Sequence, residues 1–261
     1  MRIMFIGDVF GRPGRLALSH YVPILVNKEN VDFVIANGEN AAGGFGITEK
    51  TAKEIFASGV QVITTGNHIW DKKEAVELLT RNDRLLRPIN YPPSVPGFGS
   101  GVYGFGNGGK IGVINLSGRV FMGYVDCPFR AISPVVEEIK KQTNLILVDV
   151  HAEATSEKLG LGHYLDGRVS AVLGTHTHVQ TADERVLPKS TAYITDVGMT
   201  GPEDSIIGVK KEQIIEKFFN QIPVRYEVAR GPGQFSAVIV DVDGVSGLAL
   251  SIRRLALRYP E

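Results

Sequence analysis

Short apolar runs recur along the chain, and each run stops at a cluster of glycine and polar residues. The runs are rich in valine, isoleucine and leucine, which is the pattern of strands buried on both faces of a sheet. They predict strands at residues 3–6, 33–36, 60–64, 111–116, 145–148 and 171–173.

Stretches with helical features lie between several of these predicted strands. Residues 48–58 open with Thr48, a good N-cap residue, and end against Gly59, a residue type that commonly follows a helix. Residues 71–79 and 135–142 are also predicted to be helical. Units of strand, polar loop and helix in series are typical of a layered α/β fold.

Two regions depart from this rhythm. Residues 88–109 hold four prolines and seven glycines, which predicts a loop leading into the next strand. From Val224 onward the chain alternates in the manner of strands, and a turn at 241–244 indicates an antiparallel hairpin. The strands expected in this part are 224–228, 235–240 and 247–252.

Neither a linker nor an internal repeat divides the chain, so one domain over residues 1–261 is expected. Two sheets packed face to face, with helices outside, would accommodate both the strand–helix units and the C-terminal strands. Such a chain is long enough to bury a large core without disulfides or other cross-links.

Composition limits the classes of partner and the cellular compartment that we expect for this protein. Basic and acidic side chains balance at 28 each, whereas a protein that tracks a nucleic-acid backbone normally has a basic excess. The apolar start is too short for a signal peptide, and the chain lacks the ~20 consecutive apolar residues of a membrane span. One cysteine, Cys127, fits a reducing compartment. These features predict a cytoplasmic protein with no long nucleic acid and no membrane as partner; a homo-oligomer stays open.

Five of the predicted strand ends carry side chains that bind metals. Ligands in open α/β sheets gather beyond the carboxyl ends of strands, so these loops can meet at one place. Carboxylate, amide and imidazole without thiolate suit Mn²⁺, Fe²⁺ and Zn²⁺. The candidate ligands are Asp8, Glu39, Asn40, Asn67, His151, His176 and His178, and His68 stands beside them.

Each of these elements alone has an ordinary structural interpretation. Asp8 could cap a turn, Glu39 and Asn40 could cap a loop, and His151 could be a core histidine. Five such elements at strand ends together favour a metal site. Seven ligands are too many for one ion with an open position, but they fit two ions that share a bridging carboxylate.

The motifs resemble those of the calcineurin-like metallophosphoesterases. That family carries Asp, Gly-Asp, Gly-Asn-His, His and Gly-His-x-His in this order, and the same order runs here from Asp8 to His178. Four features depart from the pattern. Phe10 stands for a histidine, Glu39 for the bridging aspartate and Ile69 for an acidic residue, and Gly-His-x-His has become Gly-Thr-His-Thr-His at 174–178. The segments 7–11, 37–40 and 151–158 are similar to the bacterial branch of small cyclic-nucleotide phosphodiesterases.

The resemblance implies a four-layer α/β/β/α sandwich and two divalent ions, with iron or manganese as the metal. One ion would take Asp8, Glu39, Asn40 and His178, and the other Glu39, Asn67, His151 and His176. A hydroxide shared by the ions would be the nucleophile. His68 would lie beside the phosphate as general acid or charge stabiliser, oriented by Asp71 or by a backbone carbonyl.

The function implied by the resemblance is hydrolysis of 2′,3′-cyclic nucleotides, or other small phosphodiesters, to 3′-nucleotides. Two alternatives stay open: a phosphomonoesterase or protein phosphatase on the same site, and a metal-loaded regulatory protein that acts through a partner surface. Glu153 and Glu157, just beyond His151, are candidate hydrogen-bond partners of the imidazoles, with surface solvation as the alternative.

Overall fold

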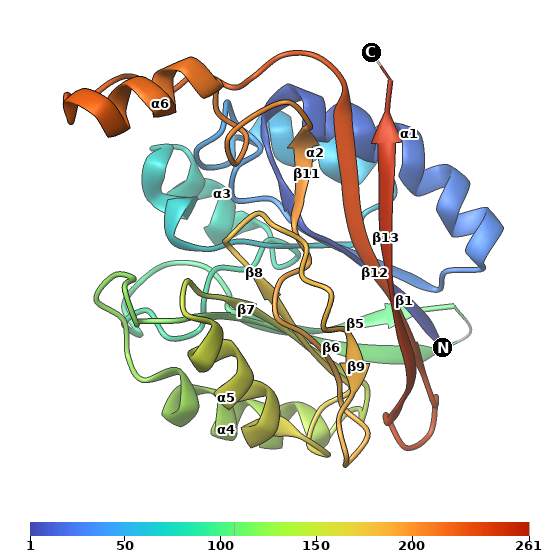
Figure 1. Cartoon of the computed structure of the whole chain (residues 1–261). Coiled ribbons are helices and arrows are strands. Elements are labelled where there is room, and N and C mark those ends of the chain that lie inside the picture. Colours follow the sequence, from blue (N-terminus) through green and yellow to red (C-terminus); the bar gives the residue numbers. More distant parts are fainter. Residues whose placement is uncertain (107, 261) are drawn as a thin grey trace.

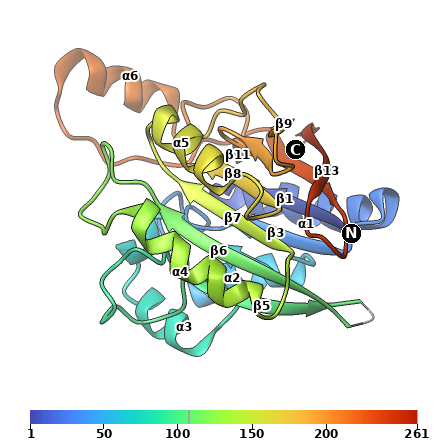
Figure 2. The same cartoon turned by 90° about the horizontal axis from the view of Figure 1, so that it is seen from below.

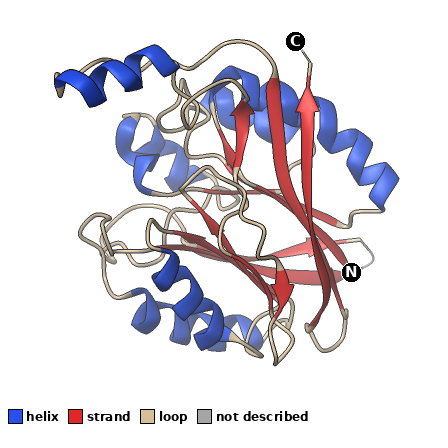
Figure 3. Ribbon diagram, in the orientation of Figure 1, coloured by secondary structure: helices blue, strands red, loops and turns tan. Residues whose placement is uncertain are grey.

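Two β-sheets pack face to face in the computed structural model, which describes residues 1–106 and 108–260. Helices cover the outer faces of both sheets (Figure 1 and Figure 3). The order of layers is therefore α/β/β/α, which confirms the predicted fold class. α1 (Gly11–Glu29) and α2 (Glu49–Ala57) lie on the first sheet, and α4 (Pro128–Lys140) and α5 (Thr155–Leu165) lie on the second.

The first sheet combines parallel and antiparallel strands. β1 pairs in parallel with β3, and β3 with β4, whereas β12 is antiparallel to both β1 and β13. The strand order is β2 (Asp8–Val9), β11 (Met199–Pro202), β12 (Gly233–Val242), β1 (Arg2–Ile6), β3 (Phe33–Asn37) and β4 (Val62–Thr64), and β13 (Ala249–Tyr259) pairs with β12.

The second sheet is parallel in its centre and antiparallel at its edges. β6, β7, β8 and β10 run parallel, and β5 and β9 close the two edges (Figure 2). The strand order is β5 (Ser100–Phe105), β6 (Gly109–Ser117), β7 (Ile146–His151), β8 (Ala171–Thr175), β10 (Ala192–Ile194) and β9 (Arg185–Val186).

Continuous apolar strands are needed because both faces of each sheet are buried. In β1, Ile3 and Phe5 pack against Leu147 of the second sheet, whereas Met4 and Ile6 belong to the cluster under α1. Side chains alternate between the faces of a strand, so an uninterrupted apolar run fills two cores at once. This explains why the apolar runs in the sequence predicted the positions of these strands correctly.

Helix α2 begins and ends where the sequence predicts. The backbone N–H of Thr51 donates to the Thr48 hydroxyl at 3.2 Å, and the backbone N–H of Thr48 donates to the Thr51 hydroxyl at 2.9 Å. This reciprocal pair satisfies two donors that a helix start leaves free. Gly59 follows the helix with a φ of +103°, a conformation that suits glycine.

Other boundaries differ from the prediction. The region 88–109 contains strand β5, because its residues pair with β6 from Ser100↔Ile114 to Phe105↔Gly109. The stretch predicted as a helix at 71–79 is a 3₁₀ turn (Asn67–Asp71) followed by α3 (Ala75–Arg81).

The C-terminal half holds two further differences. Residues 224–228 form no strand; Val228 makes an isolated bridge to Val209. The predicted helix at 135–142 is the second half of α4, which starts at Pro128.

The last helix, α6 (Lys211–Asn220), lies at the periphery (Figure 1). Among the described residues, no helix is long and apolar enough to cross a membrane.

Candidate metal centre

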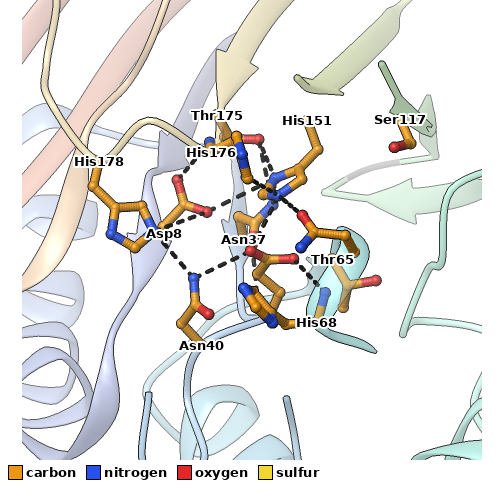
Figure 4. Close-up of polar contacts among 12 residues, drawn as sticks. Asp8, Asn37, Asn40, Thr65, His68, Ser117, His151, Thr175, His176 and His178 are labelled. Carbon is orange, nitrogen blue, oxygen red and sulfur yellow. Dashed lines mark hydrogen bonds and ion pairs between the residues drawn. The ribbon is translucent and has the colours of Figure 1, made fainter. Parts of the chain in front are cut away.

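Strand ends from both sheets meet at one edge of the sandwich (Figure 4). From the first sheet, one candidate lies on β2 and others directly follow β3 and β4. From the second sheet, one candidate ends β7 and two follow β8. Short contacts connect all eight candidates, which are Asp8, Glu39, Asn40, Asn67, His68, His151, His176 and His178.

The imidazole of His151 lies at the centre of the inner half of this cluster. Its Nε2 is 3.0 Å from Oε1 of Glu39, 3.0 Å from Nδ1 of His176 and 3.2 Å from Oδ1 of Asn67. Ligand atoms of Glu39, His151 and His176 all lie within 4.8 Å of one another. A single proton on Nε2 can donate a hydrogen bond to only one of these lone pairs, whereas a metal cation can bind all of them.

The outer half of the cluster, around Asp8 and His178, contains an unpartnered carboxylate oxygen. Oδ1 of Asp8 is buried and has no hydrogen-bond partner within the described part of the chain. It lies 3.8 Å from Nδ1 of His151 and 4.0 Å from Nε2 of His178. A buried carboxylate oxygen normally accepts hydrogen bonds or binds a cation, so Asp8 fits the role of a metal ligand.

Asn40 links the two halves through its amide. Its Nδ2 is 3.2 Å from Oε1 of Glu39 and 3.1 Å from Nε2 of His178. A metal would be bound by the amide oxygen, so ligation by Asn40 requires the amide to turn over.

The space around Gly66 explains why glycine precedes the candidate ligand Asn67. A Cβ atom at this position would lie 2.1 Å from the His151 ring and 2.3 Å from the Glu39 carboxylate. No side chain fits into that space. The glycine of the Gly-Asn-His motif therefore lets the chain approach His151 and Glu39 closely enough for Asn67 to contact His151.

Charge in the cluster is balanced between carboxylate and imidazole. Burial opposes ionisation of Glu39, but His151 outweighs this effect and lowers the pKa of Glu39 to about 2. Burial likewise opposes the charged form of His151, but Glu39 and Asp8 raise the pKa of His151 to about 9. Burial, then the charge of His151, lowers the pKa of His176 to about 3, and burial raises the pKa of Asp8. A bound cation would take over the role of the proton on His151, which provides the balancing positive charge when no cation is bound.

A buried hydrogen-bond chain fixes the orientation of His151. Its Nδ1 is 2.9 Å from the hydroxyl of Thr175, which donates to Oδ1 of Asp149 at 2.7 Å. Oδ2 of Asp149 accepts from Thr64 at 2.5 Å and from Asn37 at 3.0 Å. With Nδ1–H donating to Thr175, the lone pair of Nε2 points at the other ligands, as in histidines that bind metals.

Asp149 and Thr175 were not among the functional residues predicted from the sequence. Asp149 stands two residues before His151 on β7, so both side chains project from the same face of the strand. A buried acidic residue at that spacing from a ligand histidine was the available signal.

A second buried pair, Lys158 and Asp196, holds the turn that carries the last two histidines. His176 and His178 have φ angles of +99° and +67°, which are uncommon for residues with a side chain. Oδ2 of Asp196 accepts from the backbone N–H of Thr177 at 3.0 Å and from its hydroxyl at 2.7 Å. Nζ of Lys158, on α5, donates to the same oxygen at 2.8 Å. The buried ion pair therefore stabilises a strained turn.

His68 stands at the rim of the cluster, where its side chain is partly exposed. Its backbone N–H donates to Oε2 of Glu39 at 3.2 Å, and its imidazole Nδ1 lies 2.8 Å from Oδ2 of Asp71. The side chain is 30% exposed, so it can reach a bound substrate.

Three further residues that the sequence singled out differ in how closely they approach the histidines of the cluster. Phe10 is buried, and its ring meets the His178 ring edge to face at 5.6 Å, so an aromatic side chain fills the position of the family's histidine. Glu153 lies 3.2 Å from Nε2 of His176, as one interpretation of the sequence expected. Glu157 does not approach the imidazoles: its carboxylate accepts from the backbone N–H groups of Arg119 and Val120.

Two helix-covered sheets with carboxylate, amide and imidazole groups at their strand ends define the class: an α/β/β/α sandwich with a candidate metal centre. The chain belongs to the family described as YmdB-like protein, whose model matches residues 4–255. The match spans nearly the whole chain and includes every candidate ligand.

Individual relatives agree with this assignment. The chain is 51% identical, over 98% of its length and 97% of the relative, to a Bacillus subtilis protein named 2′,3′-cyclic-nucleotide 2′-phosphodiesterase. This similarity confirms the resemblance inferred from the motifs. A crystal structure of a hypothetical protein from Thermus thermophilus superposes with a TM-score of 0.93 at 43% identity, covering 100% of both chains. A structure described as a novel phosphatase from Mycoplasma pneumoniae also has a TM-score of 0.93, at 34% identity, covering 100% of this chain and 94% of that one.

Proposed function

We propose that the protein is a metal-dependent phosphodiesterase that hydrolyses 2′,3′-cyclic nucleotides to 3′-nucleotides. The observation that carries the proposal is the convergence of seven candidate ligands, Glu39 among them, with one buried oxygen of Asp8 left without a partner among the described residues. The name of the Bacillus subtilis relative supports the substrate class. We place the activity in the cytoplasm, in one domain formed by residues 1–261.

Two divalent ions, iron or manganese, are proposed to occupy the cluster with Glu39 between them. One set of ligands is Asp8, Glu39, Asn40 and His178; the other is Glu39, Asn67, His151 and His176. The grouping is supported by the short contacts of His151 Nε2 on one side and by the proximity of Asp8 to His178 on the other. When bound, such ions supply hydroxide near neutral pH and offset the charge of the phosphate.

His68 is proposed to hold a proton for the leaving oxygen. Water adds to phosphorus and gives up one proton, the bond from phosphorus to O2′ breaks, and O2′ takes the proton of His68. The proton released by the water restores His68, so the net reaction consumes one water. Asp71 engages Nδ1 of His68, which leaves Nε2 for the substrate. In its protonated form the imidazole can give a proton to the leaving oxygen or offset charge on the phosphate.

A substrate screen on protein purified without chelator tests the proposal. We expect two equivalents of metal and conversion of 2′,3′-cyclic AMP to 3′-AMP, with little release of phosphate from 3′-AMP or from a phosphopeptide. Faster hydrolysis of the monoesters would favour the phosphomonoesterase alternative, which the description of the Mycoplasma pneumoniae structure as a phosphatase keeps in view. Metal-loaded protein inactive on every ester would favour the regulatory alternative.

A further inference from the structure

Phe45 is a large aromatic residue that core packing does not explain. Its side chain is partly exposed, and it belongs to none of the hydrophobic clusters formed by the described residues. Three glycines surround it, with φ angles of +70° at Gly43, +92° at Gly44 and +74° at Gly46. A loop with this backbone presents its one aromatic side chain for a reason other than burial.

The loop places this ring beside the candidate active site. The backbone N–H of Gly44 donates to the carbonyl oxygen of Asn40 at 3.2 Å, and that of Ala42 donates to Gly46 at 2.9 Å. The segment that carries a candidate metal ligand therefore also fixes Phe45. The ring centroids of Phe45 and His68 are 5.1 Å apart, with the ring planes at 72°.

Tyr226, from a distant part of the chain, extends the surface. Its ring lies 6.4 Å from the Phe45 ring and within 19° of parallel. Lys217 of α6 holds it, because its ammonium donates to the Tyr226 hydroxyl and lies 4.9 Å from the ring centroid. Together the two rings form an aromatic wall beside His68, called here the Phe45–Tyr226 wall.

The aromatic pair Trp70 and Tyr91 is less suited to stacking. Trp70 packs against the hydrophobic core under the first sheet, and its ring meets Tyr91 at 86° with centroids 5.4 Å apart. In such an arrangement the edge of one ring covers the face of the other.

We propose that the Phe45–Tyr226 wall stacks with the nucleobase of the substrate. The inference rests on the proposed function, because it requires that His68 face the cyclic phosphate. In a 2′,3′-cyclic nucleotide only the ribose separates that phosphate from the base, so the base lies within reach of a ring next to His68. Stacking on aromatic rings depends little on base identity, so purine and pyrimidine substrates are both accepted.

The test compares 2′,3′-cyclic AMP with methyl ribofuranoside 2′,3′-cyclic phosphate, which has the same reacting group without a base. The wild type should prefer the nucleotide, with the difference in KM. Phe45→Ala should lower the ratio of the two kcat/KM values by about 5- to 150-fold, the usual effect of losing one stacked base. Phe45→Trp should restore the ratio. Phe219→Ala, which removes a ring that is 87% exposed on α6, serves as the control.

Each outcome decides between explanations. Equal kcat/KM of the wild type for the two esters, or an unchanged ratio in Phe45→Ala with two metals retained, would overturn the base-stacking proposal and leave the phosphodiesterase proposal standing. A loss of the same size on both esters would assign Phe45 to the support of the Asn40 loop and would also overturn it. Metal-loaded wild type inactive on both esters would instead overturn the proposed function.

Discussion

Nδ1 of His68 lies 2.8 Å from Oδ2 of Asp71, although the position directly after His68 holds isoleucine. The 3₁₀ turn Asn67–Asp71 makes this contact possible, because side chains three residues apart eclipse each other in a 3₁₀ helix. The carboxylate partner of the histidine is thus present, but it comes from the far end of the turn.

Asp71→Asn tests whether this contact orients the imidazole. The asparagine keeps a hydrogen-bond acceptor for Nδ1 but removes the carboxylate charge beside the imidazole. We expect a lower kcat on 2′,3′-cyclic AMP, a smaller loss than in His68→Ala, and an unchanged metal content. Steady-state kinetics with elemental analysis would check this. Unchanged kcat would mean that Asp71 does not orient the histidine.

His68→Ala separates catalysis from metal binding. Because the neighbouring Asn67 fills the proposed ligand position, the variant should keep two metals and its fold, yet lose about 10²–10⁴-fold in turnover of a 2′,3′-cyclic nucleotide. A nitrophenyl phosphodiester has a better leaving group and needs less protonation, so its loss should be smaller. Equal losses would assign His68 to charge stabilisation, and no loss on either ester would remove it from catalysis.

The candidate ligands could be predicted because each follows a strand that is easy to recognise. Runs such as 3–6 and 33–36 fill both faces of a sheet, so they have no polar interruptions, and the first polar residues after them mark the strand ends. The parallel order of the strands then brings the loops together.

What could not be predicted depends on contacts between distant segments. Asp149 supports the site through hydrogen bonds that Thr64 and Asn37 donate to it. Lys158 supports the site through its ion pair with Asp196, which is distant in the sequence. Local pattern also misled in the C-terminal part: the alternation of Tyr226 and Val228 reflects side chains packed on the cluster around Phe10, and not a strand.

Glu39→Ala should lose both metal ions, whereas Asp8→Ala should mainly weaken one. The reason is the central place of Glu39, whose Oε1 lies 3.0 Å from His151 Nε2 and 3.2 Å from Asn40 Nδ2. Elemental analysis of the purified variants measures this directly. Glu157→Gln is a matched control, since this glutamate is buried and its carboxylate accepts from backbone N–H groups of Arg119 and Val120. Two full equivalents retained in the Glu39 variant would refute the bridging role.

Phe10→Ala should reduce stability without removing a metal. The ring is 3% exposed and packs with Met199, Val209 and Ile214, so its loss should cost roughly 3–5 kcal/mol of unfolding free energy. Urea unfolding of the metal-loaded protein would measure the cost, and elemental analysis would follow the ions. One ion missing from a folded variant would show that the proposed ligand sets are wrong.

Lys158→Met should loosen the turn that carries His176 and His178. Lys158 is 1% exposed, and its removal leaves Asp196 as a buried charge without a cationic partner, which typically costs about 3–5 kcal/mol. The backbone of Thr177 is held by the same carboxylate, so metal affinity should fall together with stability. Adding Asp196→Asn removes the unpaired charge but keeps an acceptor for Thr177, and it should recover part of both losses. If the single variant bound metal as tightly as wild type despite being less stable, the ion pair would support the fold alone and would have no part in positioning the histidines.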